Sequence, residues 1–425
     1  MNMSPRDLLL GSFQAALSAA DPLKIVPAYL PKPPQGRTLV VGAGKAAAAM
    51  ALAVEQTWPA DAPLDGLVIT RYQHGLLTNR ITVIEAGHPV PDEAGETAAR
   101  EILRRVKGLT PHDLLLVLLS GGGSSLMSLP LEGIDMPALK ATTRELLSCG
   151  APIQDMNTVR KHLSAIQGGR LAAACRAPLL ALIISDVTGD DPTHIASGPC
   201  APDPTTYQDA LDIFGRFEVR APDTVIAHLN RGARGALPET PKPGDRIFRH
   251  VENRVIATAQ QSLAAAAAFF ASHDVQPAIL GDSVTGEARE VAKAYGALAR
   301  QVMLRRSPWA PPVALISGGE CTVTVRGKGR GGRCAEFLLS LAINLGGAER
   351  VHALACDTDG TDGSEDNAGA ILTPDALRRA EKRKLRADRL LHDNDAYAFF
   401  SALGDLVVTG PTRTNVNDYR AILIL

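Results

Sequence analysis

The first feature of this chain that could do chemistry is an apolar segment that ends in a cluster of small polar residues. Residues 114–119 are all leucine or valine, and the next six residues are Ser120, Gly121, Gly122, Gly123, Ser124 and Ser125. A short, fully apolar run predicts a buried strand of a parallel sheet. The glycines let backbone N–H groups approach a ligand because no Cβ intervenes, and the serines add hydroxyl donors. The loop therefore suits a phosphate or a carboxylate, although a tight turn at a sheet edge has the same composition.

A glycine turn that contains a lysine is the second candidate site. Residues 42–47 have the spacing G-x-G-x-x-A of a dinucleotide-binding turn, with Gly44 and Lys45 at its centre. The lysine argues against a nicotinamide cofactor, and so does Arg71, which ends the next predicted strand in place of a carboxylate. We interpret Lys45 as a point charge for a phosphate or a carboxylate. A solvated surface lysine is the alternative.

Basic residues follow at helical spacing in the segment 157–162. Asn157, Arg160 and Lys161 fall on one face of the predicted helix. Such a face either binds an anion or is simply solvated, and charge patterning alone favours neither interpretation.

Two acidic loops follow predicted strands. Asp186 and Asp190 come after the apolar run 179–184, and Asp357 and Asp359 come after the run 351–355, with Asp362 close behind. Carboxylates at the ends of parallel strands stand where ligands bind. Hard oxygen ligands favour Mg²⁺, which proteins usually share with substrate phosphates. Each loop is thus a candidate for a general base or a metal ligand, and plain polar turns are the alternative.

Two further polar loops lie in the C-terminal half. The first contains Gly318, Gly319 and Glu320, followed by a glycine-rich stretch that ends in Arg333 at the start of a predicted helix. Arginine suits phosphate oxygens, although the chain has no G-x-x-x-x-G-K-[ST] pattern. The second loop, residues 409–418, contains Thr412 and Asn415 and follows a predicted strand at 406–408.

The elements that must position these loops alternate between strand-like and helix-like segments. The predicted strands include residues 38–41, 67–70, 81–85, 114–119, 179–184, 254–257, 277–280, 313–317, 322–326 and 351–355. Such alternation is typical of an α/β fold with a mainly parallel sheet. A chain of 425 residues exceeds one core, and the segment 231–246 is rich in Gly, Pro and charge. We therefore expect two domains, residues 1–235 and 248–425.

Composition excludes several classes of function. The net charge of −1 and an aromatic content of 4% argue against a nucleic-acid partner. No apolar run approaches the roughly 20 residues of a membrane helix. The six cysteines form no C-x-x-C pair, and the N-terminal residues lack a signal-peptide pattern. We therefore expect a cytoplasmic protein without a membrane partner.

Taken together and in order, these motifs resemble the class II glycerate 2-kinase family, whose C-terminal part is the MOFRL domain. The residues that carry the resemblance are GAGKA, HPVPDEAG, LLSGGGSSLM, NTVRKHLSAIQGGRLA, ISDVTGDDPTHIASGP, ISGGE, GRGGR, DTDGTDG and GPTRTNVND, and they span nearly the whole chain. The resemblance implies a Rossmann-like N-terminal domain with a parallel sheet, a smaller α/β C-terminal domain with the MOFRL region at about 312–420, and an active site between the domains. It implies phosphorylation of D-glycerate to 2-phospho-D-glycerate by ATP, with Mg²⁺.

The resemblance also implies catalytic roles for Lys45, Arg333, Asp357 and Asp359. The chain departs from the usual family pattern at Cys334-Ala335 and at Arg413. An NAD(P)H-dependent hydroxypyruvate reductase and a non-catalytic sensor of an organic acid or nucleotide remain alternatives. We expect Asp186 and Asp190 to hold Mg²⁺, and we leave open whether the chain forms a homodimer.

Overall fold

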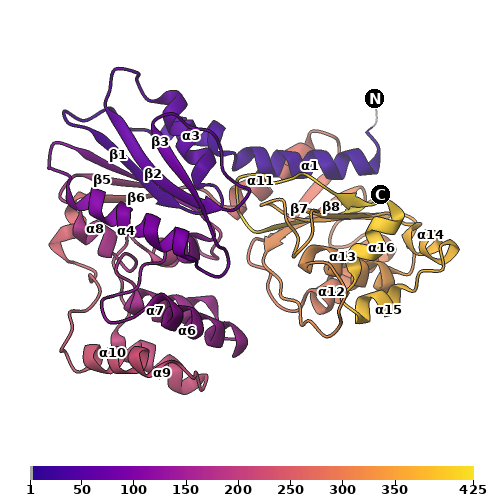
Figure 1. Ribbon diagram of the computed structural model, residues 1–425. Helices are drawn as coiled ribbons and strands as arrows, with labels where there is room; N and C mark the ends of the chain where they lie inside the picture. The colour runs from indigo at the N-terminus through magenta and orange to yellow at the C-terminus, as the bar shows by residue number, and fades with distance from the viewer. Residues whose placement is uncertain (1–2) are drawn as a thin grey trace. The chain divides into compact units, whose positions relative to one another are not determined.

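The computed structural model describes residues 3–425, which form two compact units (Figure 1). The continuous unit spans Pro22–Ile256. The split unit combines Ala257–Leu425 with the described N-terminal residues up to Asp21. This division differs from the expected domains 1–235 and 248–425, because the N-terminal helix belongs with the C-terminal half of the chain.

That helix, α1 (Pro5–Ala19), begins as its sequence predicts, after an N-cap at Ser4 whose hydroxyl accepts a first-turn N–H. Its ring at Phe13 stacks on Tyr419 with 5.8 Å between centroids. The Tyr419 hydroxyl donates to Ser12 Oγ at 2.8 Å. These two contacts join α1 to the C-terminal part of the chain, so α1 belongs to the core of the split unit.

The continuous unit is built on a six-stranded sheet in the order β3-β2-β1-β4-β5-β6, in which β1 to β5 are parallel. The order 3-2-1-4-5 is that of a Rossmann-type sheet, as expected. Its strands are β1 (Thr38–Ala43), β2 (Leu64–Arg71), β3 (Ile81–Ala86), β4 (Leu114–Leu119), β5 (Leu179–Ile184) and β6 (Val251–Ala257). Its helices are α2 (Pro22–Ile25), η1 (Val26–Tyr29), α3 (Ala47–Thr57), α4 (Glu93–Lys107), α5 (Gly123–Leu126), α6 (Met136–Ser148), α7 (Ile153–Leu163), α8 (Arg170–Ala174), η2 (Ile195–Ser197), α9 (Tyr207–Arg216), α10 (Asp223–Ala233) and η3 (Arg246–His250).

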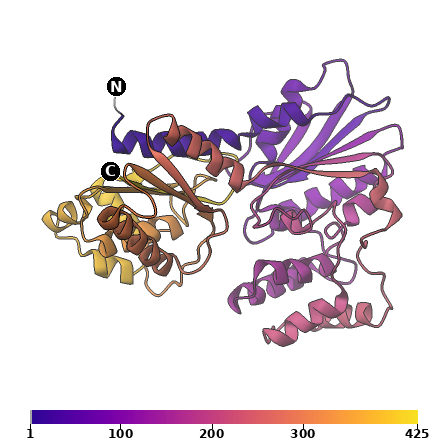
Figure 2. The same cartoon turned by 180° about the vertical axis from the view of Figure 1, so that it is seen from behind.

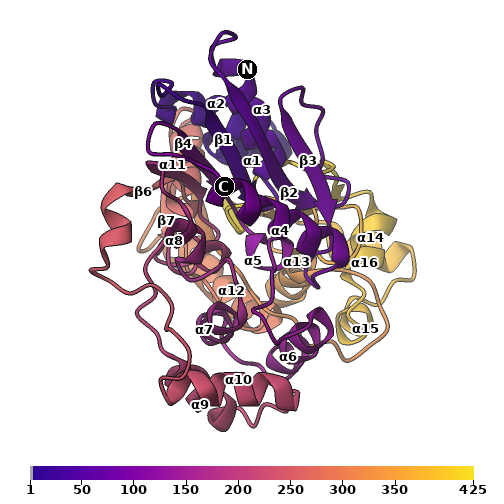
Figure 3. The same cartoon turned by 60° about the vertical axis from the view of Figure 1, so that its left-hand side comes forward.

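Two hydrophobic cores stabilise this unit. In the first, alternate residues of β1 and β4, such as Leu39 and Leu115, pack against Ile102 of α4 and Leu171 of α8. The second core joins α6, α7, α9 and α10, which lie together to one side of the sheet (Figure 3). Because β1, β4 and β5 are apolar and buried on both faces, only their ends can present polar groups to a ligand.

The split unit has a second six-stranded sheet, in the order β11-β10-β9-β12-β8-β7. Only the β7–β8 pair is parallel, and the others are antiparallel, so the expectation of a mainly parallel sheet is wrong for this half of the chain. Its strands are β7 (Gln276–Gly281), β8 (Val313–Gly319), β9 (Val351–Asp357), β10 (Gly369–Leu372), β11 (Leu406–Val407) and β12 (Asp418–Ile424). Its other helices are α11 (Ala259–Ala271), α12 (Ala288–Arg305), α13 (Arg333–Leu345), α14 (Ala376–Lys382), α15 (Ala387–His392) and α16 (Ala396–Leu403).

Helices cover both faces of this second sheet. Helices α1 and α11 lie side by side on one face, and α12, α13 and α16 pack on the other (Figures 1 and 2). The strand predicted at residues 322–326 is absent: only Thr322 forms an isolated bridge, with Glu287. Between residues 3 and 425, no helix has the length and apolar character needed to span a membrane.

Candidate active site

The glycine loop and the lysine turn form one structure at the ends of β1 and β4. The N–H of Lys45 donates to the carbonyl of Gly121 at 2.8 Å. The N–H of Ala46 donates to Ser120 Oγ at 3.0 Å. The order of strands reverses between β1 and β4, and ligands of such sheets bind outside the strand ends at this switch point.

Two glycines of these loops occupy positions that no other residue would fill without strain. Gly44 has φ +141°, and a Cβ there would lie 2.1 Å from Ser120 Oγ. Gly122 has φ +83°, and a Cβ there would lie 2.9 Å from the imidazole ring of His88 and 3.6 Å from Lys45 Cγ. Lys45 and His88 therefore flank the glycine loop. Sequence reasoning assigned no role to His88, although the motif HPVPDEAG was a signal for it.

The glycine loop carries backbone donors without a protein acceptor. In the described chain, the N–H groups of Gly121, Gly122 and Ser124 make no hydrogen bond, whereas that of Gly123 donates to the Ser120 carbonyl at 3.2 Å. Unpaired backbone donors are uncommon away from water and form concave sites for anions. This arrangement supports the anion-binding interpretation of the loop over that of a plain turn.

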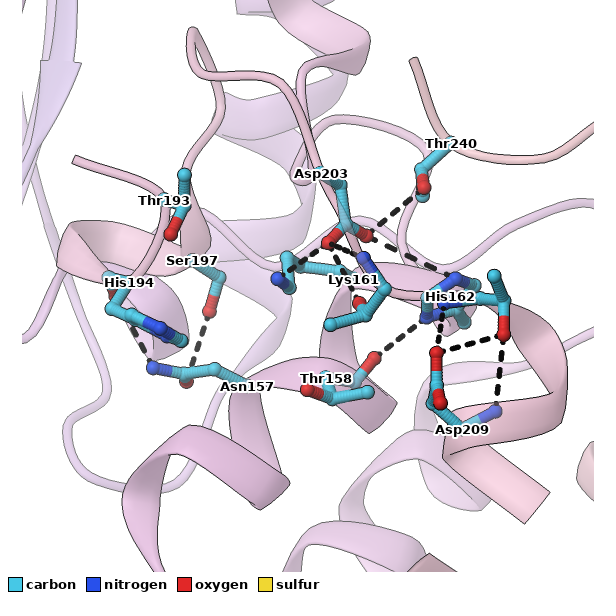
Figure 4. Close-up of polar contacts among 12 residues, drawn as sticks. Asn157, Thr158, Lys161, His162, Thr193, His194, Ser197, Asp203, Asp209 and Thr240 are labelled. Carbon is cyan, nitrogen blue, oxygen red and sulfur yellow. Dashed lines mark hydrogen bonds and ion pairs between the residues drawn. The ribbon is translucent and has the colours of Figure 1, made fainter. Parts of the chain in front are cut away.

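A hydrogen-bonded chain connects this loop to helix α7. Ser124 Oγ and Ser197 Oγ lie 2.8 Å apart, and Ser197 Oγ donates to Asn157 Oδ1 at 3.1 Å. Asn157 Nδ2 donates to the carbonyl of His194 at 3.2 Å, as Figure 4 shows. Arg160 Nη1 also donates to Asn157 Oδ1, at 3.3 Å. The loops after β4 and β5 are thus fixed to α7.

Arg160 and Lys161 have different surroundings, although the sequence places them on one face of the helix. Lys161 is 1% exposed, and its Nζ donates to Asp203 Oδ1 at 2.7 Å (Figure 4). It is therefore a buried ion-pair residue and cannot belong to an anion-binding face. Arg160 has no ion-pair partner among residues 3–425, and burial lowers its pKa to about 10. Its charge remains available to an anion.

The first acidic loop follows β5 and is partly exposed. Asp186 comes directly after the strand, and Asp190 occupies a turn with φ +55°. Asp191 Oδ1 accepts the N–H of Thr193 at 2.8 Å. Residues 3–425 contain no cluster of three or more His, Cys, Asp or Glu side chains that could hold a metal ion. A magnesium site at Asp186 and Asp190 stays a prediction.

The second acidic loop surrounds Arg333, at the first position of α13. The guanidinium donates to Asp357 Oδ2 at 2.7 Å and to Asp418 Oδ1 at 2.8 Å, and it lies 3.1 Å from Glu320 Oε1. Burial alone would lower the pKa of Arg333, but Asp418, Asp357 and Glu320 raise it well above its usual value. The second acidic loop therefore lies beside Arg333. The arginine, however, neutralises three acids instead of standing alone for a phosphate.

Hydrogen bonds also fix the loop around Asp359. The N–H of Asp359 donates to Asp357 Oδ1 at 3.0 Å, and Asp359 Oδ1 accepts the N–H of Thr361 at 2.8 Å. The carbonyl of Asp359 accepts the N–H of Thr412 at 3.1 Å, and Thr412 Oγ1 donates to the Thr358 carbonyl. Thr412 therefore supports the loop that carries Asp359.

Asp362 has a different environment. Its carboxylate is fully buried and accepts the N–H groups of Cys334 at 3.0 Å and of Ala335 at 2.8 Å. Burial raises the pKa of Asp362 to about 6, against the lowering effect of those two N–H groups and of Arg333. A pKa of about 6 still leaves this carboxyl mostly ionised at pH 7. Asp362 caps the start of α13 and so positions Arg333.

The remaining predicted residues have structural explanations. Gly319 has φ +109°, and a Cβ there would lie 2.4 Å from the backbone of Val284, whose N–H donates to the Gly318 carbonyl. Asn415 is 4% exposed, and its Oδ1 accepts the N–H of Asn417 at 3.4 Å. Roles for Gly318, Gly319 and Asn415 in nucleotide binding stay predictions.

Comparisons with known proteins agree with this geometry. Residues 8–230 match the model of a domain of unknown function, DUF4147, and residues 313–418 match the MOFRL family. A protein of Agrobacterium vitis with the provisional name hydroxypyruvate reductase is 49% identical, over 100% of this chain and 95% of its own. The D-glycerate 2-kinase of Thermotoga maritima is 38% identical, over 98% of this chain and 97% of its own. A crystal structure of glycerate kinase from the same organism superimposes with a TM-score of 0.87 at 36% identity, over 99% of both chains.

A Rossmann-type sheet with a glycine loop at its switch point is typical of α/β proteins that bind a ligand outside the carboxyl ends of the strands. The chain belongs to the glycerate 2-kinase family whose C-terminal part is the MOFRL domain.

Proposed function

We propose that the protein transfers the γ-phosphoryl group of ATP to the 2-hydroxyl of D-glycerate and releases 2-phospho-D-glycerate and ADP. The observation that carries the proposal is the glycine loop at the sheet's switch point, with three unpaired N–H groups beside Lys45. The carboxylate cluster around Arg333 supplies the complementary chemistry. Relatives named as glycerate kinases support the choice of substrate.

Phosphoryl transfer needs charge neutralisation and alignment more than covalent chemistry. In the proposed reaction, Lys45 and the N–H groups of Gly121, Gly122 and Ser124 bind phosphate oxygens. The rigid connections of this loop to the lysine turn and to Ser197 keep those donors fixed. The protein therefore does not have to reorganise them as charge develops in the transition state.

Asp359 is the proposed general base. The 2-hydroxyl oxygen of glycerate forms a bond to the γ-phosphorus while the bond from that phosphorus to the β,γ-bridging oxygen breaks, and Asp359 accepts the hydroxyl proton. Asp357 receives the N–H of Asp359 and is itself held by Arg333. The arginine thus acts through Asp357 to keep the base in place.

The family implies Mg²⁺, and the first acidic loop has the chemistry to hold it. Asp186 and Asp190 provide only oxygen ligands, which Mg²⁺ prefers, and a site with one or two carboxylates is sufficient when substrate phosphates complete it. When bound, the ion would neutralise charge on the phosphates. A cytoplasmic location and a homodimer stay predictions.

Hydroxypyruvate reduction is the second candidate function, because a relative with 49% identity has that provisional name. Two features of the structure weigh against it. Strand β2 ends at Arg71, where a nicotinamide site would need a carboxylate for the ribose, and Lys45 occupies the phosphate turn. A sensor without catalytic activity would show neither reaction.

The test compares two assays on one purified preparation. D-glycerate with ATP and Mg²⁺ should yield 2-phospho-D-glycerate, detected by phosphorus NMR, whereas hydroxypyruvate should not oxidise NADH or NADPH. Lys45→Ala should lower kcat/KM by at least about 10²-fold. Lys45→Arg should restore kcat/KM only in part, because a planar guanidinium replaces the compact ammonium group of lysine. Lys32→Ala, at an exposed position of the same unit, is the control. Activity of Lys45→Ala near that of the control would contradict this role.

A further inference from the structure

A small pocket with polar and apolar lining lies beside the glycine loop within the continuous unit. Its polar lining residues are Ser124, Ser125, Ser128, Thr143, Arg160, Ser164 and Gln167. The space open to the centre of a water-sized sphere is about 10 Å³, which accommodates one water or one oxygen atom of a ligand. The pocket is therefore too small for a nucleotide and fits only the end group of a small molecule.

Arg160 is the only charged residue among those that line this pocket in the described chain. Its only hydrogen bond there is to Asn157 Oδ1, at 3.3 Å, and it has no ion pair. The next residue, Lys161, is a buried cation that has a counter-ion, because its Nζ lies 2.7 Å from Asp203 Oδ1. A partly buried charge without a counter-ion is costly, and the cost is offset when a ligand supplies the opposite charge.

The polar groups around Arg160 are already committed elsewhere. Gln167 Nε2 donates to the carbonyl of Ser124 at 2.8 Å, and Ser128 Oγ donates to the same carbonyl at 3.0 Å. Ser125 Oγ donates to the Gly122 carbonyl at 3.1 Å. These bonds fix the loop and leave the guanidinium as the main donor for a ligand. Arginine matches the planar carboxylate group well, and a carboxylate can place one oxygen in this space with only one other terminal oxygen left outside it, whereas a phosphoryl group would leave two.

We propose that Arg160 binds the carboxylate of the acceptor substrate and thereby selects small 2-hydroxycarboxylates. This assignment rests on the proposed function and deepens it, since it separates recognition of the acid group from recognition of the transferred phosphate. Asn157 orients the guanidinium and joins it through Ser197 to the glycine loop. The acid group and the phosphate would thus be bound by groups that one hydrogen-bonded chain connects.

The test uses Arg160→Met and Arg160→Lys in the full chain, with D-glycerate and its neutral amide as substrates. Hydrogen bonds to a charged group contribute enough that KM for D-glycerate should rise about 10- to 100-fold, while KM for ATP stays within about 3-fold. The wild-type preference for D-glycerate over the amide should fall by the same factor. Arg160→Lys keeps the positive charge but loses the planar guanidinium with its paired donors, so its KM for D-glycerate should lie between those of the wild type and Arg160→Met. Arg144→Met, at an exposed site on α6, is the matched control and should be unchanged.

Calorimetric binding of D-glycerate without ATP separates this inference from the proposed function. If the wild type binds D-glycerate and Arg160→Met does not, the site assignment stands even if no phosphorylation is found. If the variants raise KM for ATP and leave that for D-glycerate unchanged, Arg160 binds phosphate and the assignment is overturned. An unchanged preference for D-glycerate over the amide would overturn it equally, and so would failure of the wild type to bind D-glycerate.

Discussion

Replacing Lys161 by methionine should destabilise the continuous unit by breaking a buried ion pair (Figure 4). Lys161 and Asp203 are 1% and 0% exposed, and removal of one member of such a pair usually costs about 3–5 kcal/mol. Asp203 would still accept hydrogen bonds from the N–H and hydroxyl of Thr205, at 3.1 and 2.7 Å, and from Thr240 at 2.9 Å. We therefore expect the lower end of the range, about 3 kcal/mol, which lowers Tm by about 6–12 °C in a unit of this size.

The size of this effect should depend on pH in a defined direction. Burial raises the pKa of Asp203, but Lys161 and the hydroxyl of Thr205 lower it further, so that the folded-state pKa is below the unfolded one. The stabilisation by the pair is thus fully present above the unfolded pKa of about 4 and is lost as pH falls through the lowered folded pKa. The difference in stability between wild type and Lys161→Met should shrink accordingly on acidification.

Scanning calorimetry at several pH values measures these differences directly. Lys32→Met removes an exposed lysine from the same unit and should change the free energy of unfolding by no more than about 0.5 kcal/mol. The double variant Lys161→Met/Asp203→Asn removes both charges and should recover part of the loss. If Lys161→Met is as stable as the Lys32 control at pH 7, the buried pair contributes nothing and the reasoning fails.

Three further predictions concern the loops. Gly122→Ala should destabilise the protein more than Gly133→Ala in a denaturant titration. Both glycines have positive φ, but only at Gly122 would the new Cβ meet an imidazole ring, at 2.9 Å. Equal losses in the free energy of unfolding would show that backbone strain alone matters. Asp359→Asn should lower kcat with little change in the Mg²⁺ requirement, whereas Asp190→Asn should raise that requirement, and the opposite pattern in a Mg²⁺ titration would exchange the two assignments. Asp362 has a folded-state pKa of about 6, above the unfolded value near 4, so the folded state binds the extra proton and the stability from this group falls as pH rises from 4 to 6. Asp362→Asn should lack this decline when the free energies of unfolding of the two proteins are compared across that pH range. Parallel pH profiles of wild type and variant would contradict the assignment.

The parts of the fold that sequence predicts well are those that local chemistry determines. The run 114–119 forms a strand that ends where the glycines begin, because six apolar side chains need burial on both faces and glycines permit the turn that follows. The acidic loop after β9 lies beside Arg333 because both follow elements of one sheet. For the strand, neighbouring residues contain the necessary information, whereas the acidic loop and Arg333 are 24 residues apart.

The predictions failed where distant residues decide. Lys161 and Arg160 are adjacent in sequence, but Asp203, 42 residues later, pairs with one and not with the other. Strand β12 lies between β8 and β9 and makes the second sheet largely antiparallel, an arrangement that depends on pairing across the whole C-terminal half. The pKa of Asp362 follows from its complete burial, which composition cannot reveal.

The place of α1 in the split unit has a consequence for synthesis of the protein. The whole continuous unit is an insertion between α1 and the rest of the split unit, since the chain leaves the split unit after Asp21 and returns to it at Ala257. On a ribosome, the continuous unit is complete when β6 has emerged, whereas Phe13 must wait for Tyr419, the sixth residue before the last. Until α11 and the later strands have emerged, the apolar face of α1 that includes Leu9 and Ala16 lacks its packing partners. The order of translation thus makes the inserted unit the first to mature and leaves the split unit dependent on the final strand of the chain.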